Sequence, residues 1–369
     1  MSRIRVFRTL FALSVVFPFG LAMAASAALG LPPVPVSPAN PQSAEKAALG
    51  KKLFFDTRFS KDGSISCASC HIPQKAFTDG NPVGVGVKGL KGTRNTPTVI
   101  NAVYYQKSFW DGRRDSLEQQ ALDPLTNPVE HGLGKLVDAI AVIKSSESYV
   151  NDFSRVFAVD NDGITPDHVG KAIAAYERTL IAGNSAFDRY QYGGDTAALS
   201  ASARRGLELF RGKGLCVTCH LIGPKNATFT DNQFHNIGVG LSEIESRASE
   251  IISVFLEARL AGTTVDNKVL SDKEASHLGR FAVTLNPADF GNFRTPDLRN
   301  VALTAPYMHD GSLKTLDEVV EFYGRGGSLK DGVRNMLQHP SIKDLNLSRT
   351  EQKDLVEFMK SLTSETLPQ

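Results

Sequence analysis

The sequence predicts a mainly α-helical protein built from two similar domains in tandem. Apolar residues recur with helical spacing in four segments, at residues 136–143, 168–181, 203–210 and 316–323, whereas strand patterns are few and short. A Cys-x-x-Cys-His run occurs twice, and each copy follows a short amphipathic helix pattern that ends in Leu-Phe. The second half of the chain therefore repeats the first.

Residues 1–27 have the features of a signal peptide. Three arginines, Arg3, Arg5 and Arg8, precede an apolar stretch over residues 10–21, and small residues follow. Ala25-Ser26-Ala27 fits an A-x-A cleavage site, and Ala22-Met23-Ala24 is the alternative. An uncleaved membrane anchor is the competing interpretation, but the apolar stretch is short for a span. We expect an exported protein with no integral membrane segment after cleavage.

The remaining chain divides into a proline-rich, extended leader at residues 28–43 and two domains at residues 44–195 and 196–369. A length of 369 residues with 41% apolar residues suffices for two globular domains. Cleavage after residue 27 would remove three arginines, and the charge balance would change from 41 minus 39, or +2, to 38 minus 39, or −1. This balance gives no reason to expect nucleic acid as a partner.

The two cysteine motifs predict two covalently attached c-type haems. The runs are Cys67-Ala68-Ser69-Cys70-His71 and Cys216-Val217-Thr218-Cys219-His220, and they contain all four cysteines of the chain. Two thiols in such a run can bond to the vinyl groups of one haem, and the histidine then reaches the iron. A redox dithiol needs no following histidine, and a zinc ribbon needs a second Cys-x-x-Cys without one. We therefore predict that His71 and His220 are iron ligands.

Six further runs carry a family resemblance that extends from about Ala44 to Gly327. They are LGKKLFFD at 49–56, RNTPT at 94–98, FWDGR at 109–113, FHNIGV at 234–239, RTP at 294–296 and APYMHDGS at 305–312. With the two haem motifs, they resemble the bacterial di-haem cytochrome c peroxidases, most closely the MauG-like branch. The resemblance implies two cytochrome c-like domains, a periplasmic location, a peroxide-reacting N-terminal haem and an electron-transferring C-terminal haem.

The resemblance also assigns the residues around the first haem. Many members close its iron with a histidine from the loop before the RNTPT run, but that loop, residues 83–93, contains no histidine here. An iron face open to peroxide is therefore expected. Glu130 matches the family's acid–base glutamate, and Gln120 and Pro124 match its neighbours. Without the resemblance, Glu130 would be interpreted as a helix-entry charge. His131 is expected at the pocket edge, with a distal ligand or a second proton group as alternatives.

Two aromatic residues are assigned to electron transfer by the same resemblance. Trp110, the only tryptophan, would relay electrons between the haems, whereas core packing is its simpler role. Tyr323 lies 323 minus 309, or 14, positions after His309, where the family carries the second haem's axial ligand and the MauG branch has tyrosine. Met308 is the alternative ligand, because His/Met ligation raises the potential of a cytochrome c. A helix-core role is the simpler interpretation of Tyr323.

A calcium ion between the haems is a further implication of the resemblance. Its ligands would be the Asn95 side chain and the main-chain carbonyls of Thr304 and Pro306, since oxygen ligands suit this hard cation. A turn residue is the simpler interpretation of Asn95. Among the other histidines, two are expected near the second haem, namely His235 and His309. Three are expected at the surface: His168, His277 and His339.

Three functions compete at this stage. The first is reduction of H2O2 with electrons from a small periplasmic cytochrome c or copper protein. The second is a MauG-like oxidase that acts on a partner protein through a high-valent iron state. Members that mature a cofactor use a surface tryptophan two residues before the second haem motif, where this chain has Gly214. The third is a plain electron carrier, which would gain nothing from an open iron or from Glu130. The sequence does not define the electron donor, and it is compatible with a homodimer.

Overall fold

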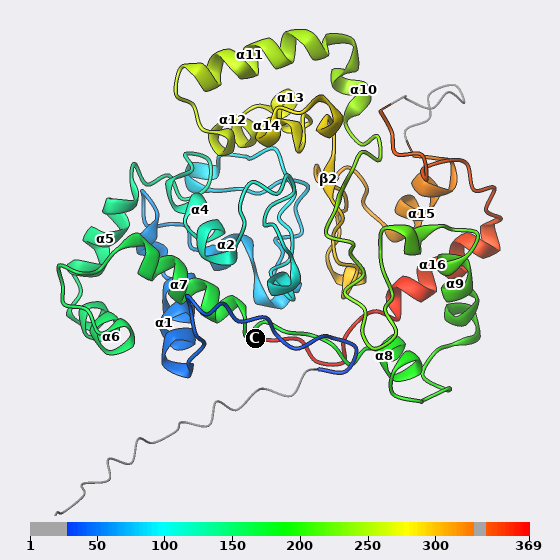
Figure 1. Ribbon diagram of the computed structural model, residues 1–369, viewed down its shortest axis with the longest axis horizontal. Helices are drawn as coiled ribbons and strands as arrows, with labels where there is room; N and C mark the ends of the chain where they lie inside the picture. The colour runs from blue at the N-terminus through cyan, green and yellow to red at the C-terminus, as the bar shows by residue number, and fades with distance from the viewer. Residues whose placement is uncertain (1–27, 328–336) are drawn as a thin grey trace, which may run out of the picture.

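The computed structural model describes residues 28–327 and 337–369, and the predicted signal peptide lies outside them. The protein is mostly helical, which confirms the predicted class (Figure 1). The helices are α1 Ala44–Phe55, α2 Cys67–Cys70, α3 Leu117–Gln120, α4 Asp123–Thr126, α5 Leu136–Lys144, α6 Glu147–Phe157, α7 Pro166–Glu177, α8 Ala186–Gln191, α9 Ala201–Arg211, α10 Leu241–Ile244, α11 Ala248–Leu260, α12 Val265–Ser271, α13 Lys273–Ser276, α14 Phe281–Thr284, α15 Leu316–Gly324 and α16 Arg349–Lys360. Strands β1 Phe234–His235 and β2 Phe293–Arg294 pair antiparallel. Within the described ranges, no helix is both long and apolar enough to cross a bilayer.

The helix patterns are confirmed, with one shorter helix than predicted. The segment expected to be helical over residues 168–181 forms α7, which already ends at Glu177. The residues after it form turns, in which the Thr179 hydroxyl donates a 2.6 Å hydrogen bond to the Tyr176 carbonyl. Leu180 nevertheless remains buried in the same hydrophobic core. The apolar spacing therefore predicted burial correctly and the helix end incorrectly.

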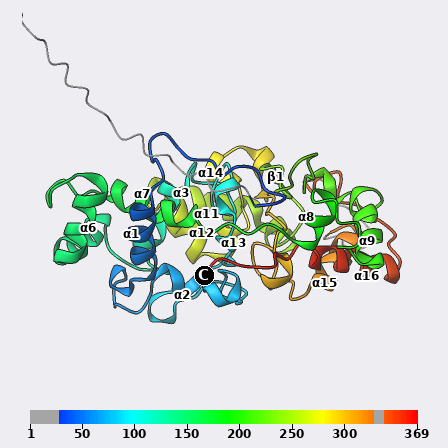
Figure 2. The ribbon, with the colours of Figure 1, turned by 90° about the horizontal axis from the view of Figure 1, so that it is seen from below.

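The internal repeat appears as two crossed helix pairs at opposite ends of the molecule. Figures 1 and 2 show α1 with α7 at one end and α9 with α16 at the other. A Cβ atom on Gly50 would lie 1.9 Å from the Ala172 carbonyl oxygen, and one on Gly206 would lie 2.0 Å from the Asp354 carbonyl oxygen. Only glycine allows such close backbone contact. The two pairs therefore use the same packing device.

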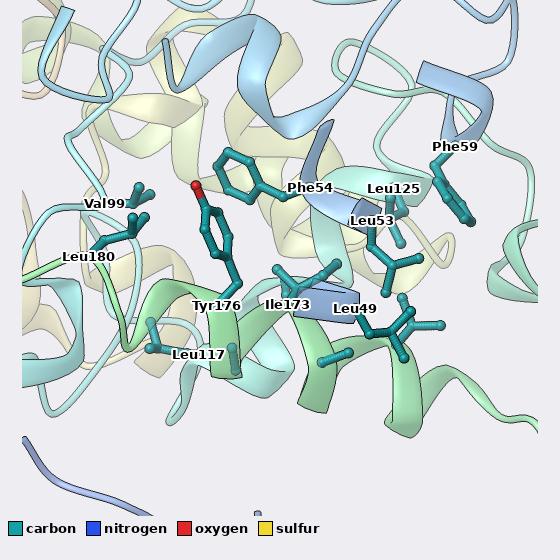
Figure 3. Packing of buried hydrophobic residues seen from close by; sticks show 14 of the residues in the cluster. Leu49, Leu53, Phe54, Phe59, Val99, Leu117, Leu125, Ile173, Tyr176 and Leu180 are labelled. Carbon is teal, nitrogen blue, oxygen red and sulfur yellow. The ribbon is translucent and has the colours of Figure 1, made fainter. Parts of the chain in front are cut away.

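Aromatic residues fill the space beside each helix pair. In Figure 3, Phe54 of α1 and Tyr176 of α7 lie side by side within the first core, with ring centroids 5.2 Å apart. In the second core, Phe210 of α9 and Phe358 of α16 have centroids 5.0 Å apart. Phe54 and Phe210 each lie in the helix that precedes a Cys-x-x-Cys-His motif. Tyr176 and Phe358 pack against these two residues. The two cores thus place both motifs on equivalent supports.

Helices α10–α14 form a third hydrophobic cluster, which lies over the first half of the molecule at the top of Figure 1. Val129 of the first half packs against this cluster. The Thr93 hydroxyl donates a 2.5 Å hydrogen bond to the Val269 carbonyl of α12. A segment from late in the sequence therefore covers the loop that precedes the RNTPT run.

The leader is extended and packed along both halves. The Tyr104 hydroxyl donates a 2.9 Å hydrogen bond to the Pro32 carbonyl, and Arg299 donates one of 2.6 Å to the Gly30 carbonyl. The buried Asn40 side chain donates to the Lys171 carbonyl of α7. These contacts connect the leader to residues 72, 131 and 269 positions away in the sequence.

Candidate active site

The first Cys-x-x-Cys-His motif forms the short helix α2. Ser66 precedes it, and its backbone N–H donates a 3.0 Å hydrogen bond to the Ser69 hydroxyl, which fixes the start of the helix. Nδ1 of His71 lies 3.2 Å from the Phe77 carbonyl oxygen. A hydrogen bond from Nδ1–H leaves Nε2 as the free ligand nitrogen, as in many metal-binding histidines. His71 and Cys70 line one cavity, which we call the first cavity.

The second motif repeats this arrangement with a tighter turn. Cys216–Thr218 forms a 3-10 turn, whereas the corresponding residues of the first motif form the α-helical turn α2. Nδ1 of His220 lies 2.8 Å from the Phe229 carbonyl oxygen, and His220 lines a second cavity together with both cysteines of its motif. None of the four cysteines forms a disulfide. The second site therefore offers what a covalent haem needs, namely two thiols, one oriented imidazole and an adjoining cavity. At the first site Cys70 and His71 line the cavity, whereas Cys67 packs against the first core.

The first cavity brings together the residues expected beside the open iron. Gln120 of α3, Pro124 of α4 and Glu130 all line it with His71. The loop at residues 83–93 contributes Gly84, Val85, Gly86 and Gly92 to the lining, none of which has a coordinating side chain. Within the described part of the chain, His71 is the only histidine that lines this cavity.

Glu130 has the properties of a proton-transfer group. Its Oε2 atom is buried and has no hydrogen-bond partner among the described residues. Burial and the nearby Asp266 carboxylate raise the pKa of Glu130 to about 8, against the opposing effect of Arg113. The backbone is fixed, because Val87 N–H donates a 2.8 Å hydrogen bond to the Glu130 carbonyl. A carboxyl group whose pKa lies near neutrality can both accept and donate a proton.

Trp110 lies between the two cavities and lines both of them. Its indole Nε1–H donates a 2.9 Å hydrogen bond to the Asn95 carbonyl, and its own carbonyl accepts one of 2.8 Å from Arg294 N–H. The side chain is therefore held by one half of the molecule and its backbone by the other. This position suits an electron relay as well as packing.

The second cavity contains both candidate axial ligands. Tyr323 of α15 and Met308 line it with His220. Burial raises the pKa of Tyr323 above its usual range. Asn95, Thr304 and Pro306, the expected calcium ligands, also line this cavity.

Two histidine predictions are wrong. His277, expected at the surface, is only 2% exposed, and its Nδ1 lies 3.0 Å from Nε2 of His309, because α13 packs beneath the loop that carries His309. His131, expected at the pocket edge, is buried, and its Nδ1 lies 2.9 Å from the Phe59 carbonyl. By contrast, His235 and His309 line the second cavity as expected.

Comparison with known proteins identifies the family. Residues 44–197 match the family model described as di-haem cytochrome c peroxidase. Over 357 residues the chain is 42% identical to cytochrome-c peroxidase IdrP1 of Denitromonas iodatirespirans, which covers 92% of this chain and 89% of the relative. The chain belongs to the di-haem cytochrome c peroxidase family. It is accordingly an oxidoreductase, and its family implies two c-type haems.

The MauG branch of the di-haem peroxidases is also close. MauG of Methylorubrum extorquens is 36% identical, with 91% of this chain and 84% of the relative covered. A MauG-like protein associated with microbial copper homeostasis has a crystal structure that matches with a TM-score of 0.73 and 31% identity, covering 95% of this chain and 96% of that one. The relatives of this chain therefore include MauG and a MauG-like protein as well as cytochrome-c peroxidases.

A buried charge network lies beside Glu130, and no sequence pattern predicted it. Asp111 accepts a 2.6 Å hydrogen bond from Arg94 and one of 3.1 Å from Arg113. Although burial opposes ionisation, these two guanidinium groups lower the pKa of Asp111 to about 2. Asp266 of α12 contacts both Arg113 and the Asn127 side chain. The FWDGR run contains two of these residues, but only the fold could show that Asp266 joins them.

Proposed function

We propose that this chain is a periplasmic peroxidase that reduces H2O2 to two waters, using two electrons and two protons. The electrons would come from a small redox protein, either a cytochrome c or a copper protein. The observation that carries the proposal is the unpartnered Oε2 of Glu130 in the first cavity, beside His71 and a loop that supplies no ligand. When bound at His71, haem c supplies the redox-active iron for this chemistry.

The chain's own residues handle the proton and the geometry. Ionised Glu130 accepts a proton from the inner oxygen of peroxide and returns it to the outer oxygen, which leaves as water. Gln120 and Pro124, on the adjoining helices, shape the space in which peroxide is oriented. Trp110 relays electrons from the second cavity to the first, since it lines both.

We assign the first haem to residues 44–195 and the second to residues 196–369. Cys67, Cys70 and His71 hold the first, and Cys216, Cys219 and His220 hold the second. Tyr323 is the proposed sixth ligand of the second iron, with Met308 as the alternative. Asn95, Thr304 and Pro306 would hold one Ca2+ by oxygen atoms.

The test is peroxide-dependent oxidation of a reduced small cytochrome c or copper protein by the purified di-haem protein. The variant Glu130→Gln keeps the shape of the side chain but cannot carry the proton, so we expect roughly a 10²–10⁴-fold loss of rate. Glu147→Gln, at the start of α6, is the matched control and should retain the wild-type rate. A Glu130→Gln rate within twofold of wild type would overturn the proposal.

Oxidation of a partner protein is the second candidate. Tyr323 in the second cavity and the similarity to MauG favour it. Gly214, where cofactor-maturing members use a tryptophan, weighs against it. Fast turnover with a reduced redox protein would support the peroxidase, whereas slow turnover with peroxide-dependent oxidation of partner side chains would support the alternative.

A further inference from the structure

The covering segment α10–α14 contributes one charged side chain to the surroundings of the first cavity. Asp266 is the second residue of α12, whose N-terminus is capped by the Thr264 hydroxyl. Its carboxylate is buried, with 9% of the residue exposed. One carboxylate oxygen contacts the Arg113 guanidinium and the other contacts the Asn127 amide. Both partners lie in the half of the chain that contains His71.

Arg113 is held on three sides. Its Nη1 group donates to the Asp111 carboxylate at 3.1 Å, its Nη2 group contacts Asp266, and its guanidinium lies 3.4 Å from the centre of the Phe109 ring. Arg113 also lines the first cavity together with Glu130. A cation beside an unpartnered carboxylate would normally pair with it, because the low dielectric of the interior strengthens their attraction.

The salt-bridged network beside Glu130 is electrically balanced without it. Arg94 and Arg113 carry two positive charges, and Asp111 and Asp266 carry two negative charges. Glu130 is therefore the one carboxylate of this group left without a cationic partner, as its unpartnered Oε2 atom shows. Without Asp266, the group would contain one surplus positive charge next to Glu130.

Asp266 also fixes the backbone beside Glu130. Asn127, which contacts Asp266 through its amide nitrogen, accepts a 3.0 Å hydrogen bond from Val129 N–H through its amide oxygen. Glu130 follows directly. The Asp266 carboxylate thus restrains both Arg113, which could otherwise pair with Glu130, and the turn that carries Glu130.

We propose that Asp266 is a positioning residue for the peroxidase reaction, which withholds Arg113 from Glu130 and so leaves Glu130 free to exchange a proton with peroxide. This inference rests on the proposed function of Glu130. It deepens that function by assigning part of the catalytic control to α12, a helix from the other half of the sequence.

The charges that face Glu130 make the direction of the effect predictable. Asp266 of α12 and Asp123 of α4 disfavour the ionised form of Glu130, whereas Arg113 favours it. Cys70 of α2 also faces Glu130, but its sulfur is neutral when bonded to haem. Removing the charge of Asp266 therefore favours ionised Glu130 and frees Arg113 to pair with it.

The experiment compares Asp266→Asn with Asp266→Glu, which keeps the charge, and with Glu250→Gln, an exposed charge removal in α11. Peroxide reduction by the di-haem protein is measured from pH 5 to pH 10. For Asp266→Asn we expect the midpoint of the pH profile to fall by about one unit and the plateau rate to fall roughly tenfold, since a paired carboxylate returns its proton poorly. Asp266→Glu should restore most of the midpoint, and Glu250→Gln should match wild type.

A second readout does not depend on turnover. The protonated carboxyl band of Glu130, assigned in infrared spectra as the band lost in Glu130→Gln, should titrate at lower pH in Asp266→Asn than in wild type. Unchanged titration and an unchanged pH midpoint would overturn the inference. If Glu130→Gln stays active, the proposed function fails, but the infrared titration still tests the Asp266 contact. Asp266→Ser repeats the charge removal with a smaller side chain if Asp266→Asn does not fold.

Discussion

Trp110 donates a 2.9 Å hydrogen bond to the Asn95 carbonyl, and these two residues each line both cavities. Asn95 N–H in turn donates to the His309 carbonyl at 2.8 Å. The indole is therefore connected through one residue to the loop that carries Met308 and His309.

We expect Trp110→Phe to slow electron transfer between the two haem sites. Phenylalanine keeps an aromatic ring but loses the Nε1–H donor and is much harder to oxidise, so the turnover rate should fall about tenfold or more. Stopped-flow absorbance would follow the oxidation of the second haem after peroxide addition. Tyr104→Phe is the control, because the Tyr104 hydroxyl bonds to the leader and the side chain packs in the first core. Equal rates in wild type and Trp110→Phe would remove the relay role.

The sixth ligand of the second iron can be decided by two substitutions. Tyr323 and Met308 both line the second cavity, so geometry permits either. We expect Tyr323→Phe to change the absorbance and paramagnetic resonance spectra of the second haem, because a phenolate ligand would be lost. Met308→Leu should leave these spectra unchanged. The opposite pattern would make Met308 the ligand and would place the potential of this haem higher.

The sequence alone was sufficient to predict the site residues that belong to a distinctive motif. The two Cys-x-x-Cys-His runs predicted two haem sites, each run lies at a cavity, and the helices before them were predicted correctly. The Glu130 assignment depended on family resemblance, since a lone glutamate before a histidine has no distinctive pattern. The fold then placed it, as expected, beside His71.

Residues brought together from distant parts of the chain could not be predicted in this way. Asp266 lies 153 positions from Arg113, in an amphipathic helix whose charged residues would ordinarily face solvent. His277 follows a short helix and has the sequence surroundings of a surface residue, yet it is covered by the loop that carries His309. In both cases the side chain is buried by the tertiary packing of α10–α14. The spacing of apolar residues along the sequence does not predict such packing.

The rate of peroxide reduction should rise with pH through the pKa of Glu130. The ionised form accepts the first proton, and burial together with Asp266 raises the pKa of Glu130 to about 8. Below this pH the group is mostly protonated and the rate should fall about tenfold per pH unit, if peroxide binding itself does not titrate. Steady-state rates at saturating electron donor would show this decrease of the rate below the pKa. In Glu130→Gln the remaining slow rate should not depend on pH in this way. If it still did, the titration would belong to another group.

Glu177 should make the protein less stable at alkaline pH. It is only 4% exposed, its Oε2 atom has no partner among the described residues, and burial raises its pKa to about 8 from an ordinary 4.5. The folded state thus favours the protonated form of Glu177. The stabilisation that this gives to the free energy of unfolding is complete below about pH 4.5 and is lost as the pH rises to 8. Glu177→Gln should be more stable than wild type at pH 8, by about 1–3 kcal/mol, and similar near pH 4.5. Denaturant unfolding at both pH values measures this, with the exposed Glu208→Gln as control.

The two glycine crossings should be equally intolerant of a side chain. A Cβ atom at Gly206 would lie 2.0 Å from the Asp354 carbonyl oxygen and 2.7 Å from the Phe358 Cβ atom, so α9 and α16 would have to separate. Overpacking of this kind costs about 1–3 kcal/mol or more, and Gly206→Ala should lower the thermal unfolding midpoint by several degrees. Gly50→Ala should do the same through α1 and α7.

The control for these crossings is Gly324→Ala in α15. A Cβ atom there would meet the Leu347 side chain at an ordinary 3.6 Å, and alanine is the better helix former, so stability should be unchanged or slightly higher. If all three alanine variants behaved alike, the close crossings would not be the support of the two cores. A loss confined to Gly50 and Gly206, accompanied by weaker haem retention at the adjoining motif in each case, is expected because each crossing holds the helix that leads directly to its Cys-x-x-Cys-His run.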